Sequence, residues 1–229
     1  MNGTVSFLQK LDTVIEQNRM LDHPFYQTWN MGKLTHTALR EYAKQYYQFV
    51  HAFPTFVSST HANTPELTVR QELLENLIEE ERGAGNHPGL WLKFADALGV
   101  TASEVSTARL LPETREAIDT LRSLTHDRPH LEGVAALYAY ESQIPEVASV
   151  KIEGLKKFYG VKDEESLSFF TVHQEADVHH SGNERNILGR YAASVEQRNA
   201  CLDAAKKSAQ AMLRLLDGVY QTYVQPSVN

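Results

Sequence analysis

The sequence contains a single cysteine, Cys201, among 229 residues. One thiol cannot form an intramolecular disulfide, and it cannot build a metal site that needs several cysteines. A single thiol also fits the reducing conditions of the cytoplasm. We therefore expect a cytoplasmic protein that is held together by an apolar core, for which a chain of this length with 42% hydrophobic residues has ample material.

Long apolar runs and clustered positive charges are missing as well. No stretch is long enough to span a bilayer, and the start "MNGTVSFLQKLD" lacks the basic residues and apolar run of a signal peptide. The formal net charge is -7, whereas phosphate binding requires clustered Lys and Arg. We therefore expect neither a membrane nor a nucleic acid among the partners of the protein.

Alternating β-branched runs and hairpin dipeptides between them are also missing, while apolar residues recur at helical spacing. After Thr35, a suitable N-cap, the residues Leu39, Tyr42, Tyr46 and Phe49 follow at steps of three and four. The pattern predicts a single all-α domain over residues 1–229, with bends at Pro54 and Pro145. The predicted helices cover about 5–20, 36–61, 65–82, 87–98, 112–125, 130–159, 163–181 and 184–223.

The segment "HQEADVHH" at 173–180 is the first candidate for chemistry. At about 100° per residue, Asp177 and His180 lie within about 40° of His173 on one helix face, whereas His179 points elsewhere. Phe169, one turn earlier, is on or beside that face, which indicates that the three polar groups point inward. Buried imidazole and carboxylate groups need partners, and together they suit iron, manganese or zinc. The alternative is a solvated face with structural histidines.

Two further segments offer inward-facing ligands. In "LLENLIEEERGAGNHPGLW", periodicity places both Glu80 and Glu81 near the apolar stripe and does not choose between them, and His87 follows the glycine break. In "LYAYESQIP", Glu141 lies among apolar residues, which is unusual for a lone carboxylate. The alternatives are an acidic helix end and a glutamate that reaches solvent. Taken together, the three segments fit a dimetal centre inside a helical bundle.

These motifs, in this order and spacing, resemble the CADD-like branch of the haem-oxygenase-like dimetal oxidases. "LDHPFYQTW", "LREYAKQYYQFVHAFP" and "GLWLKFADALGV" carry the resemblance over most of the chain. It implies a seven-helix bundle of haem-oxygenase-like (TenA- and PqqC-like) fold with two metal ions, Fe/Fe or Fe/Mn. The metal ligands that it implies here are Glu80, His87, Glu141, His173, Asp177 and His180.

The resemblance also implies a function. CADD-like proteins are implicated in making para-aminobenzoate for folate, with the ring taken from a tyrosine of the protein itself. That tyrosine corresponds to Tyr26, with Tyr42 as a second redox-active candidate, and the amino nitrogen corresponds to Lys151. Dioxygen and an external reductant would be required, and a homodimer is one possible assembly. From the residues alone, Lys151 is on an apolar helix face, where burial would lower its pKa, although a lysine that reaches solvent is the more common case.

Three alternative functions follow from the same fold. A thiaminase-II-like hydrolase would need a nucleophilic cysteine, but Cys201 is far along the chain from the motifs and fits a buried apolar role. An oxidase like pyrroloquinoline-quinone synthase would not need the full set of metal ligands. A protein-interaction module without chemistry would leave the six inward-facing ligands unexplained.

Overall fold

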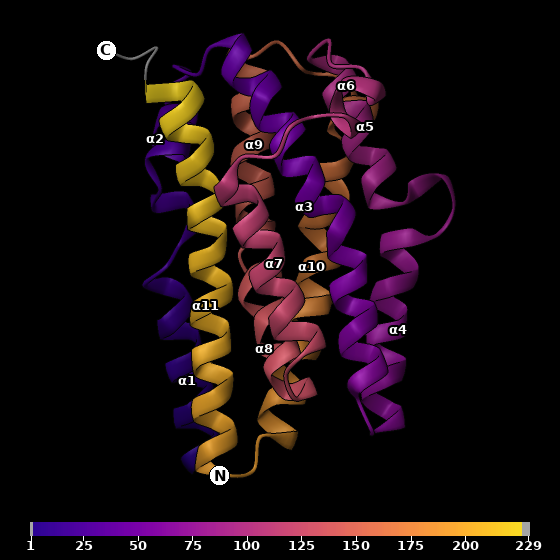
Figure 1. Ribbon diagram of the computed structural model, residues 1–229, viewed down its shortest axis with the longest axis vertical. Helices are drawn as coiled ribbons and strands as arrows, with labels where there is room; N and C mark the ends of the chain where they lie inside the picture. Colours follow the sequence, from indigo (N-terminus) through magenta and orange to yellow (C-terminus); the bar gives the residue numbers. More distant parts are fainter. Residues whose placement is uncertain (1, 226–229) are drawn as a thin grey trace.

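The computed structural model describes residues 2–225, and these residues form helices and no strand (Figure 1). Residues 1 and 226–229, which the single-domain prediction includes, lie outside this range. The predicted all-α class is confirmed, whereas the seven helices that the resemblance implies are fewer than the described residues form. The helices are α1 (Asn2–Glu16), α2 (Pro24–Asn30), α3 (His36–Asn63), α4 (Leu67–Glu81), α5 (His87–Ala97), α6 (Ala102–Ser106), α7 (Pro112–His126), α8 (His130–Glu141), α9 (Ile144–Phe158), α10 (Glu164–Tyr191) and α11 (Val195–Val219), with short turns at Met20–Asp22, Gly83–Gly85 and Tyr220–Val224.

Helix α8 is the central element of the bundle. It packs against α11 on one side and α10 on another, and it also contacts α3 and α7. Helices α1 and α11 run along one side of the molecule and α4 runs along the other (Figure 1). Every residue of α8 from Gly133 to Glu141 is buried, so its last residue, Glu141, ends inside the protein. None of the described helices is long and apolar enough to cross a membrane.

Two predicted helix boundaries are wrong, and local chemistry explains one of them. The segment 130–159 is two helices, because Pro145 occupies the first turn of α9, where no backbone N–H donor is needed. Pro145 therefore starts a helix instead of bending one. The break predicted near residue 182 is absent, since α10 continues to Tyr191, and Ser194 then caps α11 in a capping box with Gln197.

The cap of α3 is confirmed, since the Thr35 side chain accepts a hydrogen bond from the backbone N–H of Ala38. Pro54 lies inside α3, and the helix continues past it to Asn63.

Helix α2 is short and was not predicted, because a contact distant in sequence fixes it. His23 precedes it, and its Nδ1 accepts a hydrogen bond from the backbone N–H of Phe25 at 3.0 Å. The other ring nitrogen, Nε2, is 3.1 Å from a carboxylate oxygen of Asp217 on α11. This capping holds Tyr26, two residues into α2, at a fixed place in the core.

Close packing of α2 on α9 depends on Gly154. A Cβ atom at this position would overlap the indole ring of Trp29. Gly154→Ala should therefore push α2 away from α9 and lower the free energy of unfolding by about 1–3 kcal/mol, as overpacked cores do. Thermal denaturation measures this effect. The matched control is Gly182→Ala in α10, where the added methyl group meets nothing within 4 Å and helix propensity favours alanine. Equal melting temperatures for the two variants would contradict the packing account.

Candidate metal centre

The structure brings the six predicted side chains together in the interior, where α4, α5, α8 and α10 meet. They form two groups, and within each group the ligand atoms lie within 4.8 Å of one another. All six side chains are buried. The first group is Glu80, His87 and His173, and the second group is Glu141, Asp177 and His180.

In the first group, a hydrogen bond fixes one imidazole, and the other imidazole lies against a carboxylate. His173 donates from Nδ1 to the backbone carbonyl of Phe169, one turn earlier on α10, so its Nε2 keeps a lone pair. The Nδ1 atom of His87 lies 2.8 Å from Oε1 of Glu80, but without the direction of a hydrogen bond. The ring centroids of the two histidines are 4.2 Å apart. The lone pairs of this group therefore converge on a common region.

In the second group, His180 lies between buried and half-exposed carboxylates. Its Nδ1 is 3.6 Å from Oε1 of Glu141 and 3.8 Å from Oδ1 of Asp177, whereas its Nε2 is 3.2 Å from Oε2 of Glu79. Asn76 donates a hydrogen bond of 2.9 Å to Oε1 of Glu141. Carboxylate and amide groups placed behind the ligands in this way fix the orientation of the metal-binding atoms.

Several buried atoms in this region lack any hydrogen-bond partner. They are one oxygen each of Glu141 and Asp177, Nδ1 of His87 and both ring nitrogens of His180. Buried polar atoms are nearly always paired, because an unpaired one costs a substantial desolvation free energy. A divalent cation bound between the carboxylates and imidazoles would satisfy these atoms, so the residues fit the metal that the sequence implies.

The pKa values of the second group also fit a bound cation. Burial raises the pKa of the Asp177 carboxyl to about 8, and the neighbouring Glu141 and Glu80 carboxylates contribute to the rise. Burial alone would lower the pKa of His180, but its contacts with Asp177 and Glu141 raise that pKa to about 10. Without a metal, this group therefore retains protons to offset the repulsion between its carboxylates.

Burial chooses between neighbouring candidates that periodicity could not separate. Glu80 is 3% exposed, whereas Glu81 is exposed to solvent. For the two histidines, burial agrees with the choice that periodicity had already made, since His180 is 3% exposed and His179 is exposed. Sequence reasoning missed three residues beside the ligands, namely Asn76, Glu79 and Glu184. Helical spacing could have found Asn76, one turn before Glu80, and Glu184, one turn after His180.

Little space is left beside the six side chains. The cavity there has a volume of about 10 Å³, which is room for about one water molecule. Its lining includes four of the six residues together with Tyr140 and Phe169. Pockets for small organic ligands usually measure about 300–1,000 Å³.

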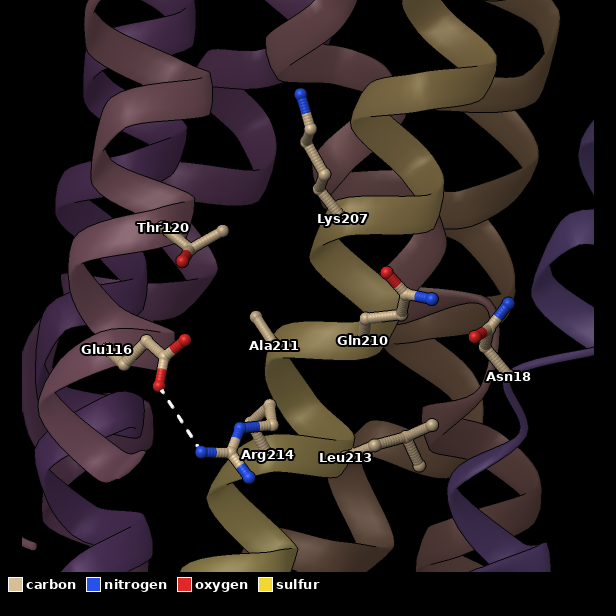
Figure 2. A pocket seen from close by; sticks show the side chains of 8 residues that line it. All are labelled: Asn18, Glu116, Thr120, Lys207, Gln210, Ala211, Leu213 and Arg214. Carbon is tan, nitrogen blue, oxygen red and sulfur yellow. Dashed lines mark ion pairs between the residues drawn. The ribbon is translucent and has the colours of Figure 1, made fainter. Parts of the chain in front are cut away.

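A surface groove of about 430 Å³ lies between α7 and α11 (Figure 2). Polar and apolar side chains line it together, and none of the six residues is part of it. Across it, Arg214 and Glu116 are 3.7 Å apart, the pair joined by the dashed line in Figure 2.

The other predicted residues lie together in a cluster of packed aromatic rings around the Lys151 amine, which we call the aromatic chamber. Tyr26 on α2, Tyr42 on α3 and Lys151 on α9 are each at most 2% exposed. The Lys151 amine is 5.8 Å from the ring centroid of Tyr26 and 5.2 Å from that of Tyr42. The rings of Tyr46, Trp91 and Phe170 also surround the amine, at 4.5, 5.5 and 5.4 Å. Lys151 makes no ion pair or side-chain hydrogen bond with the residues that the structure describes.

Cys201 has the properties of a core residue. It is 1% exposed on α11, its Sγ lies 3.5 Å from the backbone carbonyl of Leu131, and burial raises its pKa to about 12. A thiol with such a pKa is almost fully protonated near neutral pH and is a poor nucleophile.

Comparisons with known proteins agree with this arrangement. A model of a family described as iron-containing redox enzymes matches residues 40–212. The chain is 44% identical over 230 residues to 4-aminobenzoate synthase of Nitrosomonas europaea, covering 96% of this chain and 94% of that protein. It is 38% identical over 214 residues to 4-aminobenzoate synthase of Chlamydia muridarum, covering 93% and 90%. A crystal structure of a CADD-like protein of unknown function from Nostoc punctiforme has the same fold, with a TM-score of 0.81, 18% identity, and coverage of 98% of this chain and 100% of that one.

If the six side chains bind metal, the metal must stabilise the fold. Binding to the folded state alone adds about 4 kcal/mol at a thousandfold excess over the dissociation constant. Protein loaded with two metal ions should therefore melt at a higher temperature than chelated protein, as measured by differential scanning calorimetry together with elemental analysis. His180→Ala should lower the metal content, whereas His179→Ala, which changes an exposed neighbour, should leave it unchanged. Identical melting curves with and without metal would count against the site.

Proposed function

The chain belongs to the haem-oxygenase-like family of iron-containing redox enzymes, and on this premise we propose that it is an oxidoreductase that makes 4-aminobenzoate for folate synthesis from its own Tyr26. The relatives from Nitrosomonas europaea and Chlamydia muridarum are both named 4-aminobenzoate synthase, and each aligns over at least nine-tenths of this chain. The observation that carries the proposal for this chain is the buried contact between the Lys151 amine and the rings of Tyr26 and Tyr42.

In this proposal Glu80, His87 and His173 hold one metal ion, and Glu141, Asp177 and His180 hold the other. Two irons, or iron and manganese, would supply the oxidant there from dioxygen and an external reductant. The protein contributes fixed ligands and an interior without room for bulk water.

The lack of space at the centre favours a substrate that belongs to the protein. A free aromatic molecule does not fit into a cavity of about 10 Å³, whereas the Tyr26 ring is already packed in the core. This argument also disfavours the hydrolase and the quinone-forming oxidase, both of which act on a separate molecule. The hydrolase is disfavoured further by the high pKa of the Cys201 thiol.

Lys151 has the properties that an amino donor needs. An ammonium group has no lone pair, so the amine must be neutral when its nitrogen bonds to the ring carbon that loses the phenolic oxygen. The bond between Nζ and Cε of Lys151 must then break to release the product, with dioxygen and the external reductant as the redox partners. Burial lowers the pKa of Lys151 to about 7, which leaves about half of the amines neutral near neutral pH. The surrounding aromatic faces also accommodate the protonated form through cation–π contacts.

Aromatic contacts connect the aromatic chamber to the metal centre. The hydroxyl groups of Tyr46 and Tyr140 are 3.1 Å apart, and Tyr140 lines the cavity at the centre. The ring centroids of Tyr42 and Tyr46 are 5.3 Å apart. We propose that an electron passes from the aromatic chamber along these side chains to the oxidant that the metal ions would supply, because Tyr26 is not among the residues that line the cavity.

The remaining predictions concern the whole protein. We propose one domain over 1–229, located in the cytoplasm, with a homodimer as one possible assembly, and without nucleic acid or a membrane as a partner.

Isotope labelling tests the origin of the ring. Protein made with ring-labelled tyrosine, loaded with iron and supplied with reductant and air, should release labelled 4-aminobenzoate without any added aromatic precursor. Mass spectrometry of the product gives the result. Tyr26→Phe should release none at equal metal content, while Tyr191→Phe, which changes a half-buried tyrosine at the end of α10, should match the parent. Unlabelled product would rule out the protein as the source of the ring.

Substitution of Lys151 tests the origin of the nitrogen. Lys151→Arg keeps a positive charge but removes the neutral amine, because arginine stays protonated near neutral pH. The yield should fall to background at equal metal content. Lys156→Arg, at an exposed position on the same helix, should keep the yield of the parent. A normal yield from Lys151→Arg would show that the nitrogen comes from elsewhere.

The pH dependence of stability gives an independent check on Lys151. Because its pKa falls from 10.5 to about 7 on folding, the unfolded state binds more protons between these pH values. The contribution of Lys151 to the free energy of unfolding should therefore rise with pH from about 7 to about 10.5, by on the order of 5 kcal/mol. Denaturant titrations of the parent and of Lys151→Met should diverge in this window. Parallel pH profiles would contradict the buried neutral amine.

A further inference from the structure

Glu184 is a buried carboxylate that none of the preceding roles explains. It lies on α10, is 2% exposed, and neither of its oxygens has a hydrogen-bond partner. No Lys, Arg or His side chain forms an ion pair with it in the part of the chain that the structure describes. A buried carboxylate without a partner costs several kcal/mol, so its presence requires an explanation.

The position of Glu184 relates it to the second group of ligands. It follows His180 by one helical turn and Asp177 by two, so all three occupy the same face of α10. Its carboxyl group lies within hydrogen-bonding reach of the carboxyl group of Glu141 on α8. Two carboxylates have only acceptor atoms, so a cation must lie between them if both are ionised.

The charge count of the centre leaves room for a further carboxylate. The six predicted ligands include three carboxylates, whereas two divalent ions carry four positive charges. Glu184 supplies the fourth negative charge. Dimetal centres in other helical bundles likewise use four carboxylates. The second group without Glu184 offers only three side chains to its ion.

We propose that Glu184 is a seventh metal-binding side chain, which completes the ligands of the ion held by Glu141, Asp177 and His180. This inference rests on the dimetal centre of the proposed function but not on its product. The negative charge of Glu184 would offset part of the charge of the second ion, beside the carboxylate of Glu141.

Metal titration of the purified protein tests this role directly. Mn²⁺ is the probe, added to metal-free protein without dioxygen, and bound ions are counted by calorimetry and elemental analysis. The parent should bind two ions. Glu184→Gln keeps the shape of the side chain but removes its charge, so one ion should bind as in the parent and the other about 10–100-fold more weakly. Glu175→Gln, at an exposed position of the same helix, should bind both ions as the parent does.

The metal-free protein separates this role from simple packing. Glu184→Gln without metal should melt at or above the temperature of the parent, because one buried negative charge has been removed. If this variant does not fold, Glu184→Asp keeps the charge on a shorter side chain and should also bind the second ion at least about tenfold more weakly.

Two ions bound with the affinities of the parent in either folded variant would overturn the inference. A parent that binds two ions but releases no 4-aminobenzoate would contradict the proposed product. The proposed metal-binding role of Glu184 would not be affected by that result. A parent that binds no ion would contradict both.

Discussion

The structure depends on the burial of four carboxylates and three imidazoles at one place in an otherwise apolar core. Each buried charge costs several kcal/mol unless an opposite charge offsets it, and no lysine or arginine among the described residues pairs with these seven side chains. A pair of metal ions would offset the carboxylates and would use the free lone pairs of the imidazoles at the same time. This requirement explains why four helices from distant parts of the chain meet at this point.

The same dense packing determines where chemistry can take place. Because the centre has no room for an organic molecule, an oxidant formed there would meet the side chains of the protein before any other substrate. Tyr140 is at the wall of the centre, and Tyr46 connects it to the chamber that holds Tyr26 and Lys151. Burial of Lys151 disfavours its protonated form, and the neutral amine that results is the form that can act as a nucleophile. In this account the substrate and the amino donor are parts of the fold.

Local signals in the sequence predicted the all-α class, the cap at Thr35 and the inward face of His173, Asp177 and His180, because each depends on helical spacing or on a short motif. The full set of six side chains followed from the family resemblance. Features that depend on contacts between distant segments were not predictable in this way. Helix α2 is fixed by His23 and Asp217, which are 194 residues apart. The choice of Glu80 over Glu81 follows from the rotation of α4 in the bundle. Glu184 became significant only when the structure placed it against Glu141.

Peptide mapping of the protein after a single aerobic reaction tests the central claim most directly. Metal-loaded protein is mixed with reductant and air, digested, and compared by mass spectrometry with a sample kept without dioxygen. The account predicts that the peptide containing Tyr26 loses the mass of the aromatic ring together with Cβ, which becomes the carboxyl carbon of the product when the Cα–Cβ bond breaks. It also predicts that the peptide containing Lys151 is altered in the same molecules. Accumulation of 4-aminobenzoate while both peptides keep their original masses would contradict it.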